Sequence, residues 1–333
     1  PKVLEALMKT NTELLTGYCD DVYCKKAEDK ILKECNCPSG QVFLLSGGTQ
    51  TNMLACDMLL SHNEGVIAAT TGHINTHEAG AVEFTGHKIL TIEHENGKIT
   101  AKALSTYLEN FYNDSKCVPM VFPGMVFLSF PTECGTVYNK SELRAIRQVC
   151  DQYDLNLYMD GARMGYGIGS EETDLALEDI ASLCDAFYIG GTKVGALCGE
   201  ALVFPKGNAP KHFHTIMKQH GALLAKGRLV GVQFDALFTN NLYIELGKNA
   251  VIMAKKLRKD LEDNGIKPMF ESPTNQIFVL MEDKFLKKLE QSVVVRFWYR
   301  YDSTHSVVRL VTSWATTEEE IKAFEQVLCD CKP

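Results

Sequence analysis

The sequence has no hydrophobic run long enough to cross a membrane. Its longest apolar runs have the length of β-strands, whereas a membrane-spanning helix needs about 20 apolar residues. No secretory signal with a basic start and an apolar stretch is visible. The chain begins at Pro1 rather than at a methionine, so we expect an upstream segment to be missing. These absences predict a cytoplasmic protein with no membrane partner.

Positive charge is also scarce, because 34 lysines and arginines stand against 42 aspartates and glutamates, for a net charge of −8. A protein that binds nucleic acid usually carries a basic stripe, and none is visible, so we expect no nucleic-acid partner. The sequence contains neither G-x-x-x-x-G-K-[ST] nor G-x-G-x-x-G. Nothing therefore supports a nucleotide P-loop or a dinucleotide-binding fold.

Disulfides are not expected, although the chain has 12 cysteines. In a chain of this length without a secretory signal, free thiols are the better interpretation. The pairs Cys35–Cys37 and Cys329–Cys331 have a single residue between them, whereas zinc-binding pairs are separated by two to four residues. We therefore expect no metal site.

The first two thirds of the chain alternate between short apolar runs and stretches with helical spacing. With 333 residues, 45% of them hydrophobic, the chain is long enough for two domains. The alternation predicts a three-layer α/β domain, in which helices cover both faces of a mostly parallel sheet. The expected strands are 41–45, 65–69, 88–92, 125–130, 156–159, 186–189 and 201–204, and the expected helices are 53–60, 101–112 and 140–153.

The pattern changes after about residue 230. A long helical stretch, 231–264, precedes three strands at 276–281, 293–298 and 307–311, and the segment TTEEE predicts the cap of a final helix at 317–329. This arrangement indicates a smaller α+β domain, with which we expect the N-terminal helix to pack. The predicted domains are 15–240 for the large one and 1–14 with 241–333 for the small one.

A single lysine, Lys193, stands among glycines, small residues and apolar residues in FYIGGTKVGALCGEALVFPKG, and the next lysine is Lys206. The flanking runs resemble buried strands, and a lysine that loses hydration has a pKa that falls readily. Such a lysine is paired with a carboxylate, extends to the surface, or is reactive as a free amine.

The segment SGGTQTN, which begins at Ser46, lies between a predicted strand and a predicted helix. Its glycines allow a sharp turn, and the free amides at a helix N-terminus suit an anion such as a phosphate. The alternative is an ordinary strand-to-helix turn in which Thr49 or Thr51 caps the helix.

The segment LYMDGAR places Asp160 at the carboxyl end of a predicted parallel strand. Open α/β sheets bind ligands at this edge, and Arg163 offers a planar fork for a carboxylate. The alternative is an internal ion pair between Asp160 and Arg163.

The segment GHINTHEAGA holds His73 and His77, followed by Glu78. The order H-x-x-x-H-E differs from the zinc motif H-E-x-x-H, so a metal is not favoured. The alternatives are one capping or core histidine beside an exposed one, or a ring that serves as a flat stacking surface.

Together these segments fit one chemistry, that of a pyridoxal 5'-phosphate site. It needs a phosphate cradle, a lysine for the Schiff base, and a carboxylate that keeps the ring electron-poor. The lysine must be partly desolvated to act as a free amine, which Lys193 fits.

The order of these motifs resembles that of the low-specificity threonine aldolases and the wider β-eliminating lyase group. The motifs are GGTQTN, GHINTHE, PTECGTVY, DGAR, GGTKVGALCG and VRLVTSW, and the resemblance runs from LLTGYCDD to the final helix. It implies the aspartate aminotransferase fold, known as pyridoxal phosphate fold type I. It also implies a homodimer or homotetramer with shared active sites.

The resemblance also implies roles for individual residues. Lys193 would form the Schiff base, Asp160 would hold the pyridinium nitrogen, and His73 would stack on the ring or act as a catalytic base. Arg163 and Arg309 would bind the substrate carboxylate. Phosphate binding is expected from Gly48, Thr49, Gln50 and, across a dimer interface, Arg228. Glu78 and Glu133 are weaker candidates for the site, without an assigned role.

Two departures from the family pattern concern the substrate side. The family commonly has a histidine after the strand that here ends at Phe130, and another histidine where this chain has Ser313. The resemblance thus implies aldol cleavage of threonine, allo-threonine or a similar β-hydroxy-α-amino acid. The alternatives are β-elimination or transamination on the same scaffold, or a homologue that binds the cofactor without catalysis.

Overall fold

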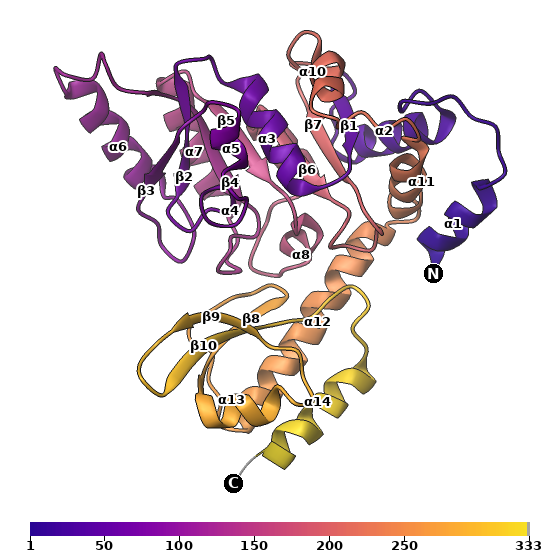
Figure 1. Cartoon of the computed structure of the whole chain (residues 1–333), viewed down its shortest axis with the longest axis vertical. Helices are drawn as coiled ribbons and strands as arrows, with labels where there is room; N and C mark the ends of the chain where they lie inside the picture. The colour runs from indigo at the N-terminus through magenta and orange to yellow at the C-terminus, as the bar shows by residue number, and fades with distance from the viewer. Residues whose placement is uncertain (332–333) are drawn as a thin grey trace.

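A seven-stranded sheet forms the centre of the larger of two lobes in this computed structural model, which describes residues 1–331 (Figure 1). The strand order is β1-β7-β6-β5-β4-β2-β3, and β7 alone runs antiparallel to its neighbours. The predicted mostly parallel sheet is thereby confirmed. Its strands are β1 (Gln41–Leu45), β2 (Glu64–Ala69), β3 (Ile89–Ile92), β4 (Phe122–Ser129), β5 (Asn156–Asp160), β6 (Ala186–Gly190) and β7 (Glu200–Phe204).

Helices cover both faces of this sheet, as expected for three layers. Successive side chains of a strand point to opposite faces, and accordingly Val126 and Leu128 join one apolar core whereas Met125 and Phe127 join another. The first core is covered by α2 (Val22–Glu34), α6 (Ala101–Asn113), α7 (Lys140–Gln152), α9 (Leu177–Leu183) and α11 (Arg228–Leu237). The second is covered by α3 (Gly48–Leu59), α4 (His73–Thr76), α5 (Ala81–Phe84) and α10 (Phe213–Gln219).

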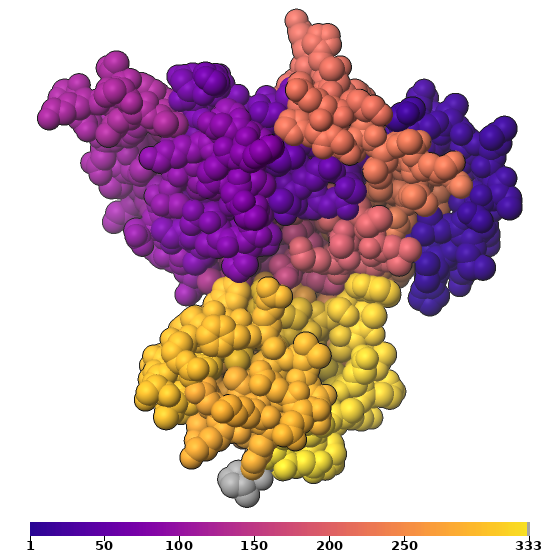
Figure 2. All heavy atoms as spheres, viewed as in Figure 1, coloured from indigo at the N-terminus to yellow at the C-terminus, as the bar shows by residue number. Residues whose placement is uncertain are grey.

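The smaller lobe is the predicted α+β unit, and Figure 2 shows it as a separate mass on one side of the larger lobe. Its antiparallel sheet has the order β8-β10-β9 and packs on helices around a third apolar core. A hydrogen bond from Thr312 Oγ1 to the carbonyl of Ala250 ties the segment after β10 to the helix that joins the lobes. The elements are α12 (Leu242–Asp263), β8 (Gln276–Glu282), α13 (Asp283–Leu289), β9 (Arg296–Arg300), β10 (His305–Val311) and α14 (Glu318–Cys331).

Local side-chain chemistry sets several helix boundaries. Asn139 and Glu142 form a reciprocal capping box at the start of α7, where the sequence predicts a helix. Thr317 and Glu320 exchange the same pair of hydrogen bonds before α14, which confirms the cap predicted from TTEEE. Each box satisfies amides that would otherwise lack a partner.

The helical stretch expected over residues 231–264 is two helices, so that expectation was wrong. Residues Asn240 and Asn241 have φ angles of 52° and 59°, and this left-handed backbone interrupts a right-handed helix. Helix α11 therefore ends before this point, and α12 starts after it.

The N-terminal helix α1 (Lys2–Thr10) contacts α11 on the larger lobe, and Figure 1 shows it beside that helix. Val3 belongs to the first core of that lobe. We expected α1 to pack with the smaller lobe, but Val3 and Leu7 pack against the larger lobe instead, whereas Leu4 and Met8 are exposed. In the part of the chain that the structure describes, no helix could span a membrane.

Candidate active site

The loop that carries Lys193 joins the antiparallel strands β6 and β7 and is closed by its own backbone. The amides of Gly191 and Thr192 both donate to the carbonyl of Gly199, at 3.0 and 3.1 Å. Gly199 has a φ of +120°, which favours glycine at this position. The hydroxyl of Tyr166 on α8 (Met164–Ile168) donates to the Lys193 carbonyl. These bonds fix the backbone from which the lysine side chain projects.

The Lys193 side chain is more accessible than the sequence suggested. We expected it to be buried between strands, whereas it is exposed. The surrounding protein still removes enough water that burial lowers the pKa of its ammonium, and the nearby Arg163 lowers it further. The negative charges of three carboxylates raise the pKa of Lys193 again, but by less than it is lowered; they belong to Asp160, Glu200 and Glu78. Lys193 is thus reachable and biased toward the free amine.

Asp160 lies at the carboxyl end of β5, as predicted, and only 4% of the residue is exposed. Its Oδ1 accepts from the Ala162 amide at 2.9 Å, and its Oδ2 accepts from Asn52 Nδ2 at 2.8 Å. Within residues 1–331 it forms no ion pair with Arg163, so the internal ion-pair alternative is wrong. This carboxylate is oriented by neutral donors and remains available to a cationic group.

The SGGTQTN segment forms the start of α3 without a side-chain cap. Gly47 is the N-cap and has no side chain to offer, so the alternative with a threonine cap is wrong. Thr49 is exposed, and Thr51 Oγ1 donates to the Gly47 carbonyl. Gly48 faces the Tyr188 hydroxyl, which an added Cβ would approach to 2.9 Å. The first amides of α3 are therefore left free for an anion, and Gln50 is held by Ser46 beside them.

A chain of buried hydrogen bonds runs from Asp160 to His73. Asn52 donates to both Asp160 and Glu78, and Glu78 Oε1 lies 2.7 Å from His73 Nδ1. This bond to Glu78 raises the pKa of the His73 imidazole. The His73 amide also donates to Glu133 Oε1 at 2.9 Å. The weaker candidates Glu78 and Glu133 therefore both orient His73.

Asn52 is the residue of this network that our sequence reasoning missed, although it stands inside the quoted SGGTQTN segment. It is fully buried and also accepts from the Tyr158 hydroxyl at 3.0 Å. Its polar neighbours in a glycine-rich turn could have drawn attention to it. Its partners, however, come from β5 and the segment after α4, which the sequence alone does not bring together.

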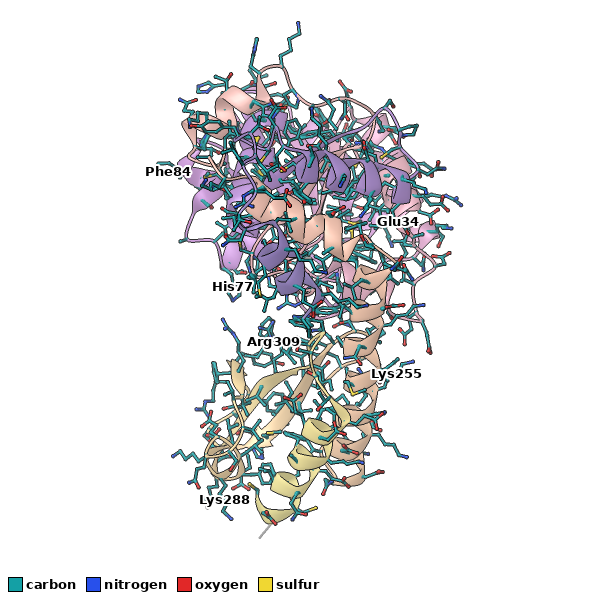
Figure 3. The ribbon with its side chains drawn as sticks, turned by 90° about the vertical axis from the view of Figure 1, so that its right-hand side faces the viewer. Glu34, His77, Phe84, Lys255, Lys288 and Arg309 are labelled. Carbon is teal, nitrogen blue, oxygen red and sulfur yellow. The ribbon has the colours of Figure 1, made fainter. Side chains whose placement is uncertain are left out.

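The smaller lobe contributes Arg309 to the same site. Figure 3 shows Arg309 at the edge of this lobe that faces His77 of the larger lobe. Its Nη1 donates to Gln276 Oε1 at 2.9 Å, and its Cζ lies 5.2 Å from the centroid of the Trp298 ring. Burial, together with Arg163 and then Arg296, lowers the pKa of Arg309 to about 10. The two lobes thus bring together Arg309 and Arg163, as predicted.

Within the described chain, neither arginine forms an ion pair with a carboxylate. Burial lowers the pKa of the Arg163 guanidinium. Arg309 Nε is buried without a hydrogen-bond partner. Two unpaired guanidinium groups beside a reachable amine form a site that can hold the carboxylate of an amino acid.

Arg228 lies away from these residues in this chain. It stands at the start of α11, where its guanidinium donates to the carbonyls of Thr10 and Asn11. Its guanidinium is therefore held by the end of α1 rather than by the predicted phosphate-binding residues.

The comparisons with known proteins agree with this geometry. Residues 6–284 match the β-eliminating lyase family. The chain belongs to the β-eliminating lyase family. The family resemblance inferred from its motifs is thereby confirmed.

This β-eliminating lyase family member is similar to characterised relatives over nearly its whole length. It is 30% identical to the low specificity L-threonine aldolase of a Pseudomonas species, over 97% of this chain and 92% of the relative. The solved Leishmania major threonine aldolase superposes with a TM-score of 0.95 at 39% identity, covering 99% of this chain and 95% of the other. Aspartate aminotransferase from Thermus thermophilus superposes with a TM-score of 0.69 at 15% identity, over 99% and 88% of the two chains. The predicted fold class is confirmed.

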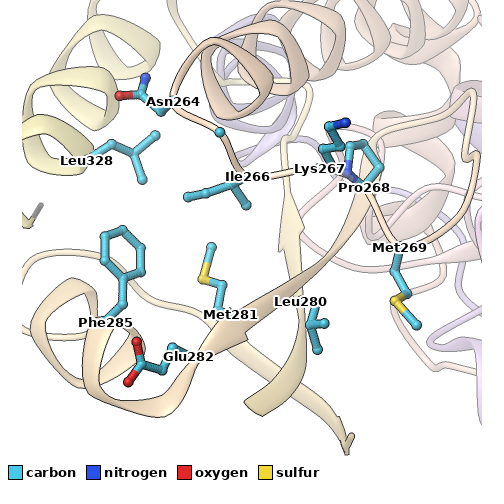
Figure 4. Close-up of a pocket in the computed structure, with 11 residues that line it drawn as sticks. Asn264, Ile266, Lys267, Pro268, Met269, Leu280, Met281, Glu282, Phe285 and Leu328 are labelled. Carbon is cyan, nitrogen blue, oxygen red and sulfur yellow. The ribbon is translucent and has the colours of Figure 1, made fainter. Parts of the chain in front are cut away.

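Another hollow in this family member, of about 610 Å³, lies in the smaller lobe (Figure 4). The segment that follows α12, together with β8, α13 and α14, lines it mainly with apolar side chains, among them Ile266, Met281 and Phe285. None of the predicted site residues lines it, so this pocket is separate from the candidate site.

Glu200 is a second residue that our sequence reasoning missed. It begins β7, is 5% exposed, and its Oε2 accepts from the Gly191 amide at 3.0 Å. Burial raises the pKa of this carboxyl to about 7, against the opposing effects of Thr192 and Lys193. The folded state therefore retains a proton that the unfolded chain loses near pH 4.5.

The pH dependence of stability follows from this raised pKa. A carboxyl whose pKa is higher in the folded state favours folding at low pH, and this contribution is lost as the pH rises from 4.5 to about 7. Glu200→Gln, which keeps an acceptor for Gly191, should reduce that loss by about 2–3 kcal/mol. Urea unfolding of both proteins at the two ends of this range measures it. If the free energy of unfolding changed equally with pH in both proteins, Glu200 would ionise at its ordinary pKa.

Proposed function

We propose that this chain is a pyridoxal 5'-phosphate-dependent lyase. It would cleave L-threonine, L-allo-threonine or a similar β-hydroxy-α-amino acid to glycine and an aldehyde. The observation that carries the proposal is the convergence of three features between the lobes. These are the reachable amine of Lys193, the oriented carboxylate of Asp160, and the unpaired guanidinium groups of Arg163 and Arg309. The names of the relatives support the same activity.

The residues present fit this cofactor. Free amides at the start of α3, next to Gly48, Thr49 and Gln50, suit its phosphate. The buried Asp160 suits its pyridinium nitrogen, and Lys193 Nζ would attach its aldehyde. When bound, the cofactor supplies an electron-poor ring that accepts the electron pair of the broken Cα–Cβ bond.

Each side chain would then have a separate task. Arg163 and Arg309 would hold the α-carboxylate from opposite lobes and so orient the bond that breaks. His73 would donate a hydrogen bond from Nδ1–H to Glu78 Oε1. Its other ring nitrogen, Nε2, would then accept the proton of the β-hydroxyl group. Lys193 Nζ would return a proton to Cα of the glycine product.

Incubation with L-allo-threonine and pyridoxal phosphate, followed by product analysis, tests the proposal. We expect glycine and acetaldehyde in equal amounts. Ammonia and 2-oxobutanoate would show β-elimination instead, and a change in absorbance without any product would show a cofactor site with another substrate.

Arg309→Ala should weaken substrate binding and leave cofactor binding nearly intact. A charge-assisted hydrogen bond is worth about 1.5–3 kcal/mol, so KM should rise by about 10- to 100-fold. Steady-state kinetics and a cofactor titration measure the two effects separately. If substrate and cofactor binding fell together, Arg309 would serve the structure rather than the substrate.

We further propose a homodimer or homotetramer with shared sites, in the cytoplasm. Exposed Leu197 and Leu229 both bond through their backbones to Gln233, and they form an apolar surface next to Arg228. A second copy on this surface would bring Arg228 near the phosphate cradle of its neighbour. The twelve free thiols suit a reducing compartment. Light scattering of the purified protein measures the assembly, and a monomer would contradict it.

A further inference from the structure

Two arginines lie directly opposite each other on the sheet of the smaller lobe. In the antiparallel pairing of β9 with β10, Arg296 is the register partner of Arg309. Like charges in this position destabilise a sheet, because the two side chains project from neighbouring points on the same face. The structure thus keeps an unfavourable pair beside the active site.

The face that carries this pair is the one that lines the active site. The opposite face of β10 presents Val308 and Leu310 to the core beneath the sheet. Trp298, two residues after Arg296 on β9, lies on the same face, and its ring lies under the Arg309 guanidinium.

Arg296 acts on groups of the larger lobe across the site. The His77 ring lies parallel to the Trp298 ring, with centroids 6.5 Å apart and 11° between the planes. Burial lowers the pKa of His77, and the charges of His73, Arg296 and Arg309 lower it further. Arg296 therefore lies close enough to His77 for its charge to act on that ring.

No carboxylate of the protein neutralises Arg296 within residues 1–331. Arg300, on the same strand, is paired with Asp283. In the proposed function, Arg163 and Arg309 already bind the α-carboxylate of the amino acid. One guanidinium on the site face is therefore left for a second anionic group, and its planar fork matches a carboxylate.

We propose that Arg296 binds a second carboxylate, on the side chain of the substrate. The preferred substrates would then be β-hydroxy-α-amino acids with an acidic side chain, of which 3-hydroxyaspartate is the simplest. This inference rests on the proposed aldol cleavage. The Cα–Cβ bond breaks, the β-hydroxyl loses its proton, and Cα gains one, so 3-hydroxyaspartate gives glycine and glyoxylate without any oxidant.

The test compares kcat/KM for L-threo-3-hydroxyaspartate and L-allo-threonine in the pyridoxal phosphate-loaded enzyme. We expect the native protein to prefer the dicarboxylate, and Arg296→Gln to lower the ratio of the two values by about tenfold or more. Arg300→Gln is the matched control. It removes a guanidinium from the same strand, but that guanidinium already forms an ion pair with Asp283. It should leave the ratio unchanged.

A binding measurement separates recognition from chemistry. Calorimetry with succinate, a dicarboxylate that cannot be cleaved, should show weaker binding to Arg296→Gln than to the native protein. An unchanged ratio together with unchanged succinate binding would overturn the role of Arg296 while leaving the aldol cleavage intact. Cleavage of neither amino acid by the native protein would instead overturn the proposed function.

Discussion

Lys193→Ala is expected to abolish turnover and the covalent attachment of pyridoxal phosphate. Proton transfer by a placed side chain contributes about 10²–10⁴-fold, and Lys193 would also supply the amine that holds the cofactor. We therefore expect activity to fall by at least about 10³-fold. Reduction with borohydride, followed by peptide mass analysis, should find the cofactor on residue 193 of the native protein alone.

Lys206→Ala is the matched control for this experiment. Lys206 is the next lysine in the chain, and it pairs with Asp185, so its loss should leave the reduced adduct in place. An adduct that persisted in Lys193→Ala would move the covalent site to another lysine.

Asp160→Asn should produce the second largest loss. Removal of one partner from a buried ion pair costs about 3–5 kcal/mol, which corresponds to about 10²–10⁴-fold in kcat. The asparagine keeps an oxygen for the Ala162 amide, so the turn after β5 should be preserved. Stopped-flow measurement of product formation and a cofactor titration report the effects on rate and affinity.

The exposed Asp154 provides the comparison for this substitution. Its φ of 54° suits asparagine, so Asp154→Asn should change neither rate nor cofactor affinity. If Asp160→Asn retained nearly full kcat, the carboxylate would hold Asn52 and the turn rather than the cofactor.

The sequence predicted the large sheet well because buried parallel strands are nearly continuous apolar runs. It did not predict helix α2, whose charged residues weaken the apolar pattern, or the break at Asn240 and Asn241. Asparagine is only a moderate sign of left-handed backbone, and a periodic pattern that continues beyond it obscures the interruption.

The sequence predicted those candidate site residues whose side chains are chemically distinctive in their own segment. Lys193, Asp160, Arg163 and Arg309 stand out by charge in apolar or glycine-rich surroundings, and the structure gathers them between the lobes. The exposure of Lys193 and the bridging role of Asn52 were not predicted, because both depend on elements distant in the chain. The side-chain amide of Asn52 is also uncharged, so it does not stand out in the sequence as a candidate site residue.

Helix α12 links the position of Arg309 to the larger lobe. Because a helix rises about 1.5 Å per residue, Ala250 lies about 12 Å along α12 from its start at Leu242. Thr312, just beyond the Arg309 strand, is bonded to Ala250. The start of α12 is fixed to the larger lobe, because the Tyr243 hydroxyl accepts from the Gly165 amide and donates to the Gly190 carbonyl. One continuous helix therefore sets the separation between the Arg309 strand and the residues of the larger lobe.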